Sequence, residues 1–501
     1  MVPTAQTSTL NVLFIASEAD PLVKAGGLGD VAGSLPRALR ALPGEQLGGT
    51  KLDVRLAIPY YPFIHAEKWH PNLLAKLTLP YPGDHPPVEI YGINLEGVPT
   101  YLIKSEPIDH SKSTYSLDAS EDGDKFILFS LVALEMGKAL EWKPDILHAN
   151  DWHTAIAAYE LARKRSSEPF FGDIATLLTL HNLPFMGAGT EKTLENYGIP
   201  SSLDPALPEW ARSIPLPMGL SAADKIVAVS PTYAKEILTP GFGCDLQDFL
   251  HTRADHIEGI LNGLDTKVWN PEKDPNISAN FSVGTLQNKK IDKQALQAEF
   301  GLEDAPNIPL LVLISRMDRQ KGVDIALEGL HLAGALAWQV ILLGSGDPIL
   351  EAACQKLQSE FPDKVRAAIR FDSALSHRLY AGGDVIMMPS RYEPCGLAQL
   401  IAMHYGTIPL AHAIGGLTDT IQDVSKPNPT GFLFSDLTPQ SFANGLHRCF
   451  NDYQQKTTWA TLQKNAMQQD FSWKQSALKY AALYRDLKEA KSKIKEIPYE
   501  V

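Results

Sequence analysis

Cysteine is scarce in this chain of 501 residues, with four copies that lie far apart: Cys244, Cys354, Cys395 and Cys449. Their spacing contains no zinc-ligand pattern, and a chain of this length can build its core without a disulfide framework. Long apolar runs are missing too. No stretch approaches the roughly 18 apolar residues of a membrane-spanning helix, and residues 10–16 are too few for the apolar part of a signal peptide. We therefore expect a soluble, cytoplasmic protein.

Positive charge is also in short supply. The formal net charge is -13, from 45 Lys and Arg against 58 Asp and Glu. This balance argues against nucleic acid or an anionic membrane as a partner. A phosphate site would need local cations, which draws attention to Lys24, Arg316 and Lys321.

Two common glycine motifs are absent. The chain has no G-x-x-x-x-G-K-[ST] and no G-x-G-x-x-G, which excludes a P-loop and the usual dinucleotide fingerprint. It has instead an apolar run at 12–15, then a turn with Lys24, Gly26 and Gly27, and then a helical pattern. Glycines admit a ligand close to the backbone, and a helix N-terminus favours negative charge. The turn indicates a site for a phosphate or sugar diphosphate, or simply a tight strand-to-helix connection.

Short apolar runs alternate with helical patterns in both halves of the chain. We predict strands at 52–58, 145–149, 174–180, 226–230, 310–315, 340–343, 385–388 and 408–411. Runs that are apolar on both faces are typical of buried parallel strands, so two doubly wound α/β halves are expected. Residues 269–282 read as a linker between them. The helix that begins near Trp473 ends in a lysine-rich turn, 488–495, expected to be solvated.

Six motifs, in the same order, carry a resemblance to a known family. They are Lys24-Ala25-Gly26-Gly27-Leu28, His148–His153, His181-Asn182-Leu183, Gly259–Gly263, Ser315-Arg316 with Gln320-Lys321-Gly322, and Arg391–Leu397. From about residue 11 to residue 484 the chain resembles bacterial glycogen synthases and plant starch synthases.

The resemblance implies the GT-B fold, in which two Rossmann-like domains face a deep interdomain cleft. It implies an N-terminal domain over 1–260 on the acceptor side and a C-terminal domain over 261–472 for the nucleotide-sugar donor. The tail, 473–501, is expected to return to the N-terminal domain. Ligands of open α/β sheets bind at the carboxyl ends of the strands, so residues after strands of both halves can converge.

The implied reaction is transfer of glucose from ADP-glucose to the non-reducing end of an α-1,4-glucan, such as glycogen or a maltooligosaccharide, with retention of configuration. The leaving diphosphate gains negative charge, so the enzyme must supply cations. Arg316 and Lys321 are implied to bind the diphosphate. Glu393 occupies the place of the family's key glutamate. The second acid that many retaining transferases carry eight residues later is Ile401 here, so we predict no carboxylate pair.

His181 and Asp151 are the nearest candidates for the far face of the sugar. We favour a same-face mechanism, in which the leaving phosphate helps deprotonate the acceptor, His181 orients the sugar and Asp151 binds hydroxyls. Whether retention instead uses a covalent intermediate stays open.

Further residues are implied to bind the donor. They are Lys24, Gly26, Gly27, Asn262, Gly344, Phe371, Cys395, Gly396, Leu397 and Thr418. Phe371 stands where relatives commonly carry a tyrosine, so it keeps the stacking face and loses the hydroxyl. The choice of ADP-glucose over UDP-glucose rests on the resemblance alone.

We expect no cofactor and no metal. Asp122-Gly123-Asp124 mimics a metal-binding D-x-D motif, but it is expected in a polar turn, and cationic side chains can take the metal's role. Three alternatives are weaker. An epimerase of the same fold would need no glucan acceptor, and this chain carries the K-x-G-G-L loop of the synthases instead. A glucan-binding protein without catalysis predicts loss of Lys24, Arg316, Lys321 or Glu393. A phosphorylase needs a lysine-bound cofactor and a larger chain.

Overall fold

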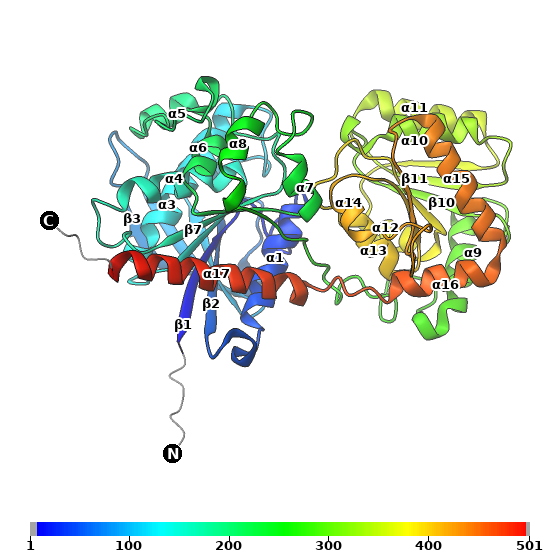
Figure 1. Ribbon diagram of the computed structural model, residues 1–501, viewed down its shortest axis with the longest axis horizontal. Coiled ribbons are helices and arrows are strands. Elements are labelled where there is room, and N and C mark those ends of the chain that lie inside the picture. The colour runs from blue at the N-terminus through cyan, green and yellow to red at the C-terminus, as the bar shows by residue number, and fades with distance from the viewer. Residues whose placement is uncertain (1–7, 497–501) are drawn as a thin grey trace, which may run out of the picture. The chain divides into compact units, whose positions relative to one another are not determined.

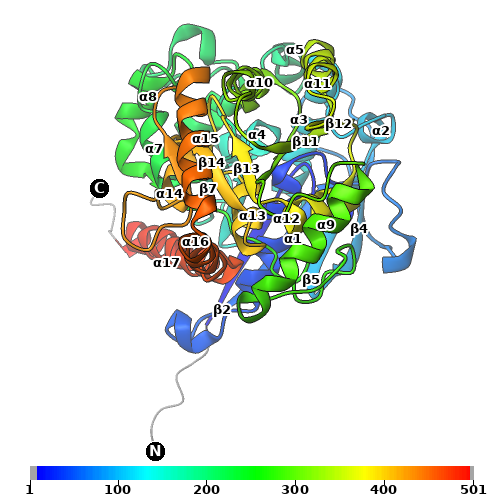
Figure 2. The same ribbon diagram turned by 90° about the vertical axis from the view of Figure 1, so that its right-hand side faces the viewer.

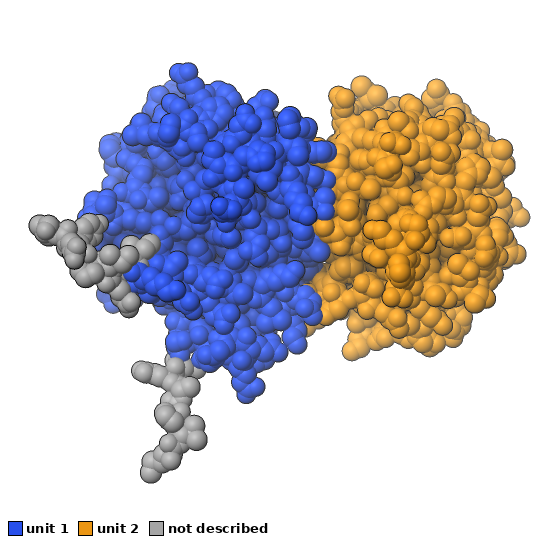
Figure 3. Space-filling view, in the orientation of Figure 1, with its two compact units in different colours: residues 1–263, 473–501 blue, residues 264–472 orange. Residues whose placement is uncertain are grey.

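The computed structural model describes residues 8–496, and the chain forms two compact units (Figures 1 and 3). Unit 1 comprises residues 1–263 and 473–501, and unit 2 comprises residues 264–472. The chain therefore leaves unit 1 once and returns to it at Trp473. The last residues of the expected returning segment, 497–501, lie outside the described part.

Unit 1 contains a nine-stranded sheet with helices around it. Its strands are β1 (Thr9–Ile15), β2 (Lys51–Pro59), β3 (Asn72–Leu77), β4 (Val88–Leu95), β5 (Val98–Lys104), β6 (Ile146–Asn150), β7 (Ala175–Leu180), β8 (Lys225–Ala228) and β9 (Ile257–Gly259). Its α-helices are α1 (Gly27–Arg40), α2 (Glu106–Asp109), α3 (Ala119–Ala139), α4 (Trp152–Lys164), α5 (Glu191–Asn196), α6 (Pro215–Ala222), α7 (Pro231–Glu236), α8 (Gln247–Thr252) and α17 (Trp473–Glu496).

The order of the strands in unit 1 is β3-β4-β5-β2-β1-β6-β7-β8-β9. All neighbouring pairs are parallel except those that β4 makes with β3 and β5. The central strands β6 and β7 are buried along their whole length, as expected for strands covered on both faces. The chain moves outward in one direction from β1 to β2 and in the other from β6 to β9, so the order reverses between β1 and β6.

Unit 2 contains a six-stranded parallel sheet in the order β12-β11-β10-β13-β14-β15. Its strands are β10 (Leu310–Ile314), β11 (Gln339–Gly344), β12 (Val365–Ile369), β13 (Val385–Met388), β14 (Ile408–His412) and β15 (Phe432–Phe434). Its α-helices are α9 (Lys289–Glu299), α10 (Val323–Leu332), α11 (Pro348–Glu360), α12 (Ser373–Gly382), α13 (Ala398–His404), α14 (Gly415–Thr420), α15 (Pro439–Gln454) and α16 (Lys456–Met467).

The helices of unit 2 cover both faces of its sheet. Helix α10 packs against α11 and α15, whereas α12 packs against α9 and α13, and Figure 2 shows the two groups on opposite sides of β13 and β14. Strand order reverses between β10 and β13, which pair directly. In open α/β sheets such a reversal opens a crevice at the carboxyl ends of the strands.

The eight strands predicted from apolar runs are all present, and the doubly wound α/β class is confirmed. The antiparallel hairpin β4–β5 and the strands β3, β9, β12 and β15 were not predicted. These strands are half-buried, short or broken by polar residues, so they lack the continuous apolar run used as the signal.

The predicted linker 269–282 is not a free connection. Asp274 is buried and accepts hydrogen bonds from His377 (2.6 Å) and from the Tyr405 hydroxyl (2.6 Å). The Trp269 ring stacks on His377, with ring centroids 4.1 Å apart. The prediction of a linker was wrong, because these contacts pack residues 269–274 onto α12 and the segment belongs to unit 2.

Helix α17 is fastened to the sheet of unit 1 at several points. The Tyr484 hydroxyl lies 2.6 Å from Nδ1 of the buried His148, whose Nε2 lies 2.7 Å from the Thr179 hydroxyl. The lysine-rich end is not simply solvated, because Lys488 pairs with Asp145 and Lys491 pairs with Asp224. None of the helices within residues 8–496 is long and apolar enough to cross a bilayer.

Replacement of Tyr484 by Phe tests the attachment of α17. The change removes only a hydroxyl, but it leaves a ring nitrogen of the fully buried His148 without its partner. We expect the free energy of unfolding of unit 1 to fall by about 1–3 kcal/mol, read as a lower denaturant midpoint. Tyr91→Phe, on the solvent-facing pair with Glu89, is the matched control and should leave the midpoint nearly unchanged. Equal midpoints for Tyr484→Phe and the wild type would contradict the tether.

Candidate active site

The predicted cations of unit 2 lie on the loop that follows β10. Lys321 ends a short 3-10 turn, Arg319–Lys321, which Asp318 caps by accepting the N–H of Lys321 at 3.1 Å. Arg316 is 62% exposed and lies 3.2 Å from the Asp318 carboxylate. The loop therefore presents one exposed and one half-buried cation at the carboxyl end of a central strand.

Glu393 follows β13, the strand next to β10, and is buried. Nζ of Lys321 lies 2.9 and 2.8 Å from its two carboxylate oxygens, and the Ser390 hydroxyl donates to it at 2.9 Å. A buried carboxylate requires such partners because desolvation of an unpaired charge is costly. The structure thus brings together Lys321 and Glu393, which are 72 residues apart in sequence.

The other unit 2 candidates also lie at or after the carboxyl ends of strands. Gly344 ends β11, Phe371 follows β12, Cys395, Gly396 and Leu397 precede α13, and Thr418 lies in α14. Phe371 is 90% exposed, so its ring is free to stack. Packing alone requires glycine at position 344, since a Cβ there would lie 1.9 Å from the Ser315 carbonyl oxygen.

The lysine and glycine turn of unit 1 follows β1. Nζ of Lys24 donates to Asp30 at 2.6 Å, and Gly26 precedes α1 in an extended conformation. A Cβ at Gly27 would meet no atom within 4 Å, so this position borders open space.

Glu18 organises this turn and was not among the predicted residues. It is buried, and its carboxylate accepts the N–H groups of Ala25 and Gly26 (3.0 Å for Gly26) and the Tyr115 hydroxyl at 2.9 Å. These two N–H groups are therefore engaged within the protein. Glu18 is the first charged residue after the buried apolar strand β1, and this is the sequence signal that could have found it.

Asp151 follows β6 with φ 53 and ψ -171, a region that costs a non-glycine residue about 1–3 kcal/mol. Its carboxylate accepts the N–H of His181 at 2.7 Å. Burial raises the pKa of Asp151 to about 7, against the lowering effect of the N–H groups of His181 and Asn182. Backbone strain of this kind is concentrated at functional sites.

The His181 ring has a defined tautomer. The Asn150 amide donates to the Ile15 carbonyl at 3.0 Å, so its oxygen accepts from Nε2 of His181 at 2.9 Å. Burial lowers the pKa of His181 to about 3, which keeps the ring neutral. Nδ1 is then an acceptor, suited to a hydroxyl group.

Among the described residues of unit 1, the buried polar atoms without a protein partner include Oδ1 of Asn262 and Nδ1 of His153. Such atoms require a water or a ligand group. Asn262 is a predicted site residue, whereas His153 was quoted only as part of a motif. Burial lowers the pKa of His153 to about 3.

The prediction of a polar turn at Asp122-Gly123-Asp124 is wrong. Asp122 and Asp124 lie in helix α3, not in a turn. Asp122 pairs with Lys125 at 2.7 Å, and Asp124 accepts from the Thr193 hydroxyl at 2.6 Å. Across residues 8–496, no group of three or more His, Cys, Asp and Glu side chains could hold a metal ion.

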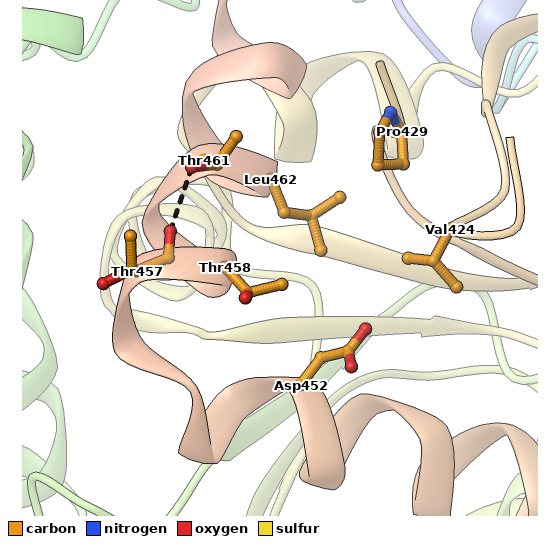
Figure 4. A pocket seen from close by; sticks show the side chains of 7 residues that line it. All are labelled: Val424, Pro429, Asp452, Thr457, Thr458, Thr461 and Leu462. Carbon is orange, nitrogen blue, oxygen red and sulfur yellow. Dashed lines mark hydrogen bonds between the residues drawn. The ribbon is translucent and has the colours of Figure 1, made fainter. Parts of the chain in front are cut away.

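A cavity of about 280 Å³ lies elsewhere in unit 2 (Figure 4). Its lining residues are Val424, Pro429, Asp452, Thr457, Thr458, Thr461 and Leu462. None of them is a predicted site residue.

The main candidate residues form two groups, one at each reversal of strand order. They are Lys24, Asp151 and His181 in unit 1, and Arg316, Lys321 and Glu393 in unit 2.

Each of the two units matches a known protein family. Residues 11–252 match the family model of the starch synthase catalytic domain, and residues 308–452 match that of glycosyl transferases group 1. The chain is 37% identical over 487 residues to the glycogen synthase of Anaeromyxobacter dehalogenans, covering 95% of this chain and 99% of that protein. It is also 37% identical over 485 residues to that of Lactobacillus acidophilus, with 95% and 100% covered.

Among solved structures, the chain resembles the catalytic domain of Starch Synthase IV from Arabidopsis thaliana bound to ADP and acarbose. The TM-score is 0.86 at 32% identity, covering 96% of this chain and 100% of the other. A sucrose-phosphate synthase from Thermosynechococcus elongatus shares the fold, with a TM-score of 0.58 at 20% identity.

The raised pKa of Asp151 predicts a pH dependence. Its ordinary pKa of 3.8 applies to the unfolded chain, whereas the folded carboxyl keeps its proton up to about pH 7. Between these values the folded state binds the extra proton, so this group makes stability fall by at most about 1.4 kcal/mol per pH unit as pH rises. Asp151→Asn removes this loss, and its stability relative to the wild type should increase by about 2–3 kcal/mol from pH 5 to pH 8.

Denaturant titrations at pH 5 and pH 8 measure this difference. Asp423→Asn is the control. Burial alone would raise the pKa of Asp423, but the N–H groups of Leu433 and Ser425 lower it, so this carboxylate is ionised at both pH values. An Asp151→Asn difference that is the same at both pH values would contradict the raised pKa.

Proposed function

The chain belongs to the glycogen synthase family of glycosyltransferases, and from that premise we propose that it transfers glucose from ADP-glucose to the non-reducing end of an α-1,4-glucan with retention of configuration. The observation that carries the proposal is the full-length match to glycogen synthases, which covers 99% of one relative's length. Residues of both groups described above contribute to the proposed chemistry.

The unit 2 group fits the donor side. Breaking the C1–O bond leaves negative charge on a diphosphate, and cations placed at that oxygen lower the barrier. Arg316 is exposed and can bind phosphate through two parallel hydrogen bonds, whereas Lys321 adds a compact charge. Each cation is matched by a carboxylate, Asp318 or Glu393. We propose that a donor diphosphate shares these cations and that Glu393 keeps Lys321 in place and binds the sugar. Phe371 would stack on the base.

The unit 1 group fits the sugar and the acceptor. The neutral His181 ring offers Nδ1 as an acceptor for a glucose hydroxyl. The backbone carbonyl of His181 stabilises positive charge on the sugar. Asp151 and Asn262 would bind further hydroxyls, since Oδ1 of Asn262 has no protein partner. We propose that the acceptor attacks on the face that the diphosphate leaves.

Donor identity and location are further parts of the proposal. The similar plant structure is described as bound to ADP and acarbose, which supports an adenine nucleotide and a glucan-like acceptor. We place the enzyme in the cytoplasm on the sequence argument alone. An epimerase and a glucan-binding protein without catalysis are less consistent with the retained Lys24, Arg316, Lys321 and Glu393.

Transfer of labelled glucose to glycogen tests the proposal. ADP-glucose and UDP-glucose are compared at equal concentration with EDTA present. We expect label in polymer from ADP-glucose, because cationic side chains take the metal's role. Absence of transfer from both donors would refute the proposed function, and restoration by a divalent cation would refute metal independence.

Glu393→Gln tests the role of the buried carboxylate. Loss of its charge releases Lys321 and removes a charged group beside the sugar, so we expect kcat to fall by about tenfold to a hundredfold. Glu299→Gln, in a surface pair with Arg378, is the matched control and should keep the wild-type kcat. A wild-type kcat for Glu393→Gln at saturating donor would remove Glu393 from the chemistry.

A further inference from the structure

Arg391 begins the segment that carries Glu393, and the proposed chemistry assigns it no part. Its Nη1 and Nη2 atoms donate to the two oxygens of Asp324 at 2.8 and 2.6 Å. Nη1 also donates to the Arg319 carbonyl at 2.8 Å. The guanidinium therefore joins the start of α10 to the loop that precedes it. These contacts use three of the five N–H donors of the guanidinium.

The loop that Arg391 contacts is the one that carries Arg316 and Lys321. The backbone N–H of Arg391 donates to the Gln320 carbonyl at 2.7 Å, and the Gln320 amide donates to the Tyr392 carbonyl at 3.3 Å. The loop after β10 and the loop after β13 are thus bound to each other through both the backbone and the side chain of Gln320.

Gly322 brings the two backbones into direct contact. It has φ +65, and a Cβ there would lie 1.9 Å from the Pro389 carbonyl oxygen. Lys321 directly precedes Gly322 in the chain, and its ammonium group pairs with Glu393. Any shift of the loop would therefore change the distance between Lys321 and Glu393.

We propose that Arg391 is a positioning residue for glucosyl transfer: by bridging Asp324 and the Arg319 carbonyl, it holds the loop of Arg316 and Lys321 in register with Glu393. This inference rests on the proposed function. It predicts an effect on turnover without contact to substrate.

The arrangement differs from an ordinary surface ion pair. Exposed pairs contribute about 0–1 kcal/mol to stability, whereas this guanidinium is 25% exposed and satisfies a carboxylate and a carbonyl at once. Lysine cannot reproduce that geometry, because its donors radiate from one atom. Displacement of a catalytic group by about 1 Å can cost a hundredfold in rate.

Three single variants in the full chain test the inference. Arg391→Gln removes the bridge, and Arg391→Lys keeps the charge without the two-pronged contact. Arg448→Gln is the control, because Arg448 also joins a carboxylate, Asp423, to a carbonyl, Leu433, in unit 2. We expect Arg391→Gln to lower kcat about tenfold to a hundredfold, Arg391→Lys to recover only part of it, and Arg448→Gln to keep the wild-type kcat.

A second pair of measurements separates positioning from general destabilisation. Since Arg391 acts through Asp324, the double variant Arg391→Gln with Asp324→Asn should lose no more kcat than the more impaired single variant. Amide hydrogen exchange of residues 316–322 should be faster in Arg391→Gln and unchanged in Arg448→Gln.

The outcomes also distinguish this inference from the proposed function. A wild-type protein that transfers glucose, together with a wild-type kcat for Arg391→Gln, overturns the positioning role and leaves the function standing. A wild-type protein without transfer overturns the function, and hydrogen exchange then decides the loop contact alone. Unchanged exchange in Arg391→Gln overturns the inference in either case.

Discussion

Parallel pairing of buried strands is the constraint on which the rest of this structure depends. Parallel strands need crossover connections, so every strand of a run ends at the same edge of its sheet. In unit 2 this places the loops after β10 and β13 side by side, and in unit 1 it does the same for the loops after β1 and β6. Both sheets reverse their order between these strands. Polar groups that are far apart in sequence therefore lie close together at this edge of each sheet.

Charge pairing then decides how those groups can be used. Glu393 is buried, and its carboxylate is held by Lys321 and Ser390. In unit 1, burial raises the pKa of Asp151 and keeps the His181 ring neutral. Unit 2 thus presents cations balanced by carboxylates, whereas unit 1 adds neutral or weakly ionised hydrogen-bonding groups to its own pair of Lys24 with Asp30. This division suits a reaction with an anionic leaving group on one side and sugar hydroxyls on the other.

The sequence predicted the fully apolar strands, the doubly wound class and the family, because buried parallel strands have a continuous apolar run and the motifs follow in order. It did not predict the β4–β5 hairpin, whose signal is alternation of apolar and polar residues. It also did not predict the packing of residues 269–282, which depends on specific contacts such as that of Asp274 with His377. Nor did it predict the use of Glu18 within the turn of unit 1 or the bridge made by Arg391. Both contacts depend on where a side chain points after folding, which the position of a charged residue after an apolar strand does not specify. The roles of the individual site residues stay predictions.

The central claim is that the loops after β10 and β13 hold the donor diphosphate. A crystal structure of the full chain with ADP bound tests it most directly. We expect the diphosphate oxygens to lie within about 3 Å of Nζ of Lys321 and of the Arg316 guanidinium, with the adenine ring against Phe371. A diphosphate bound away from both cations would contradict it.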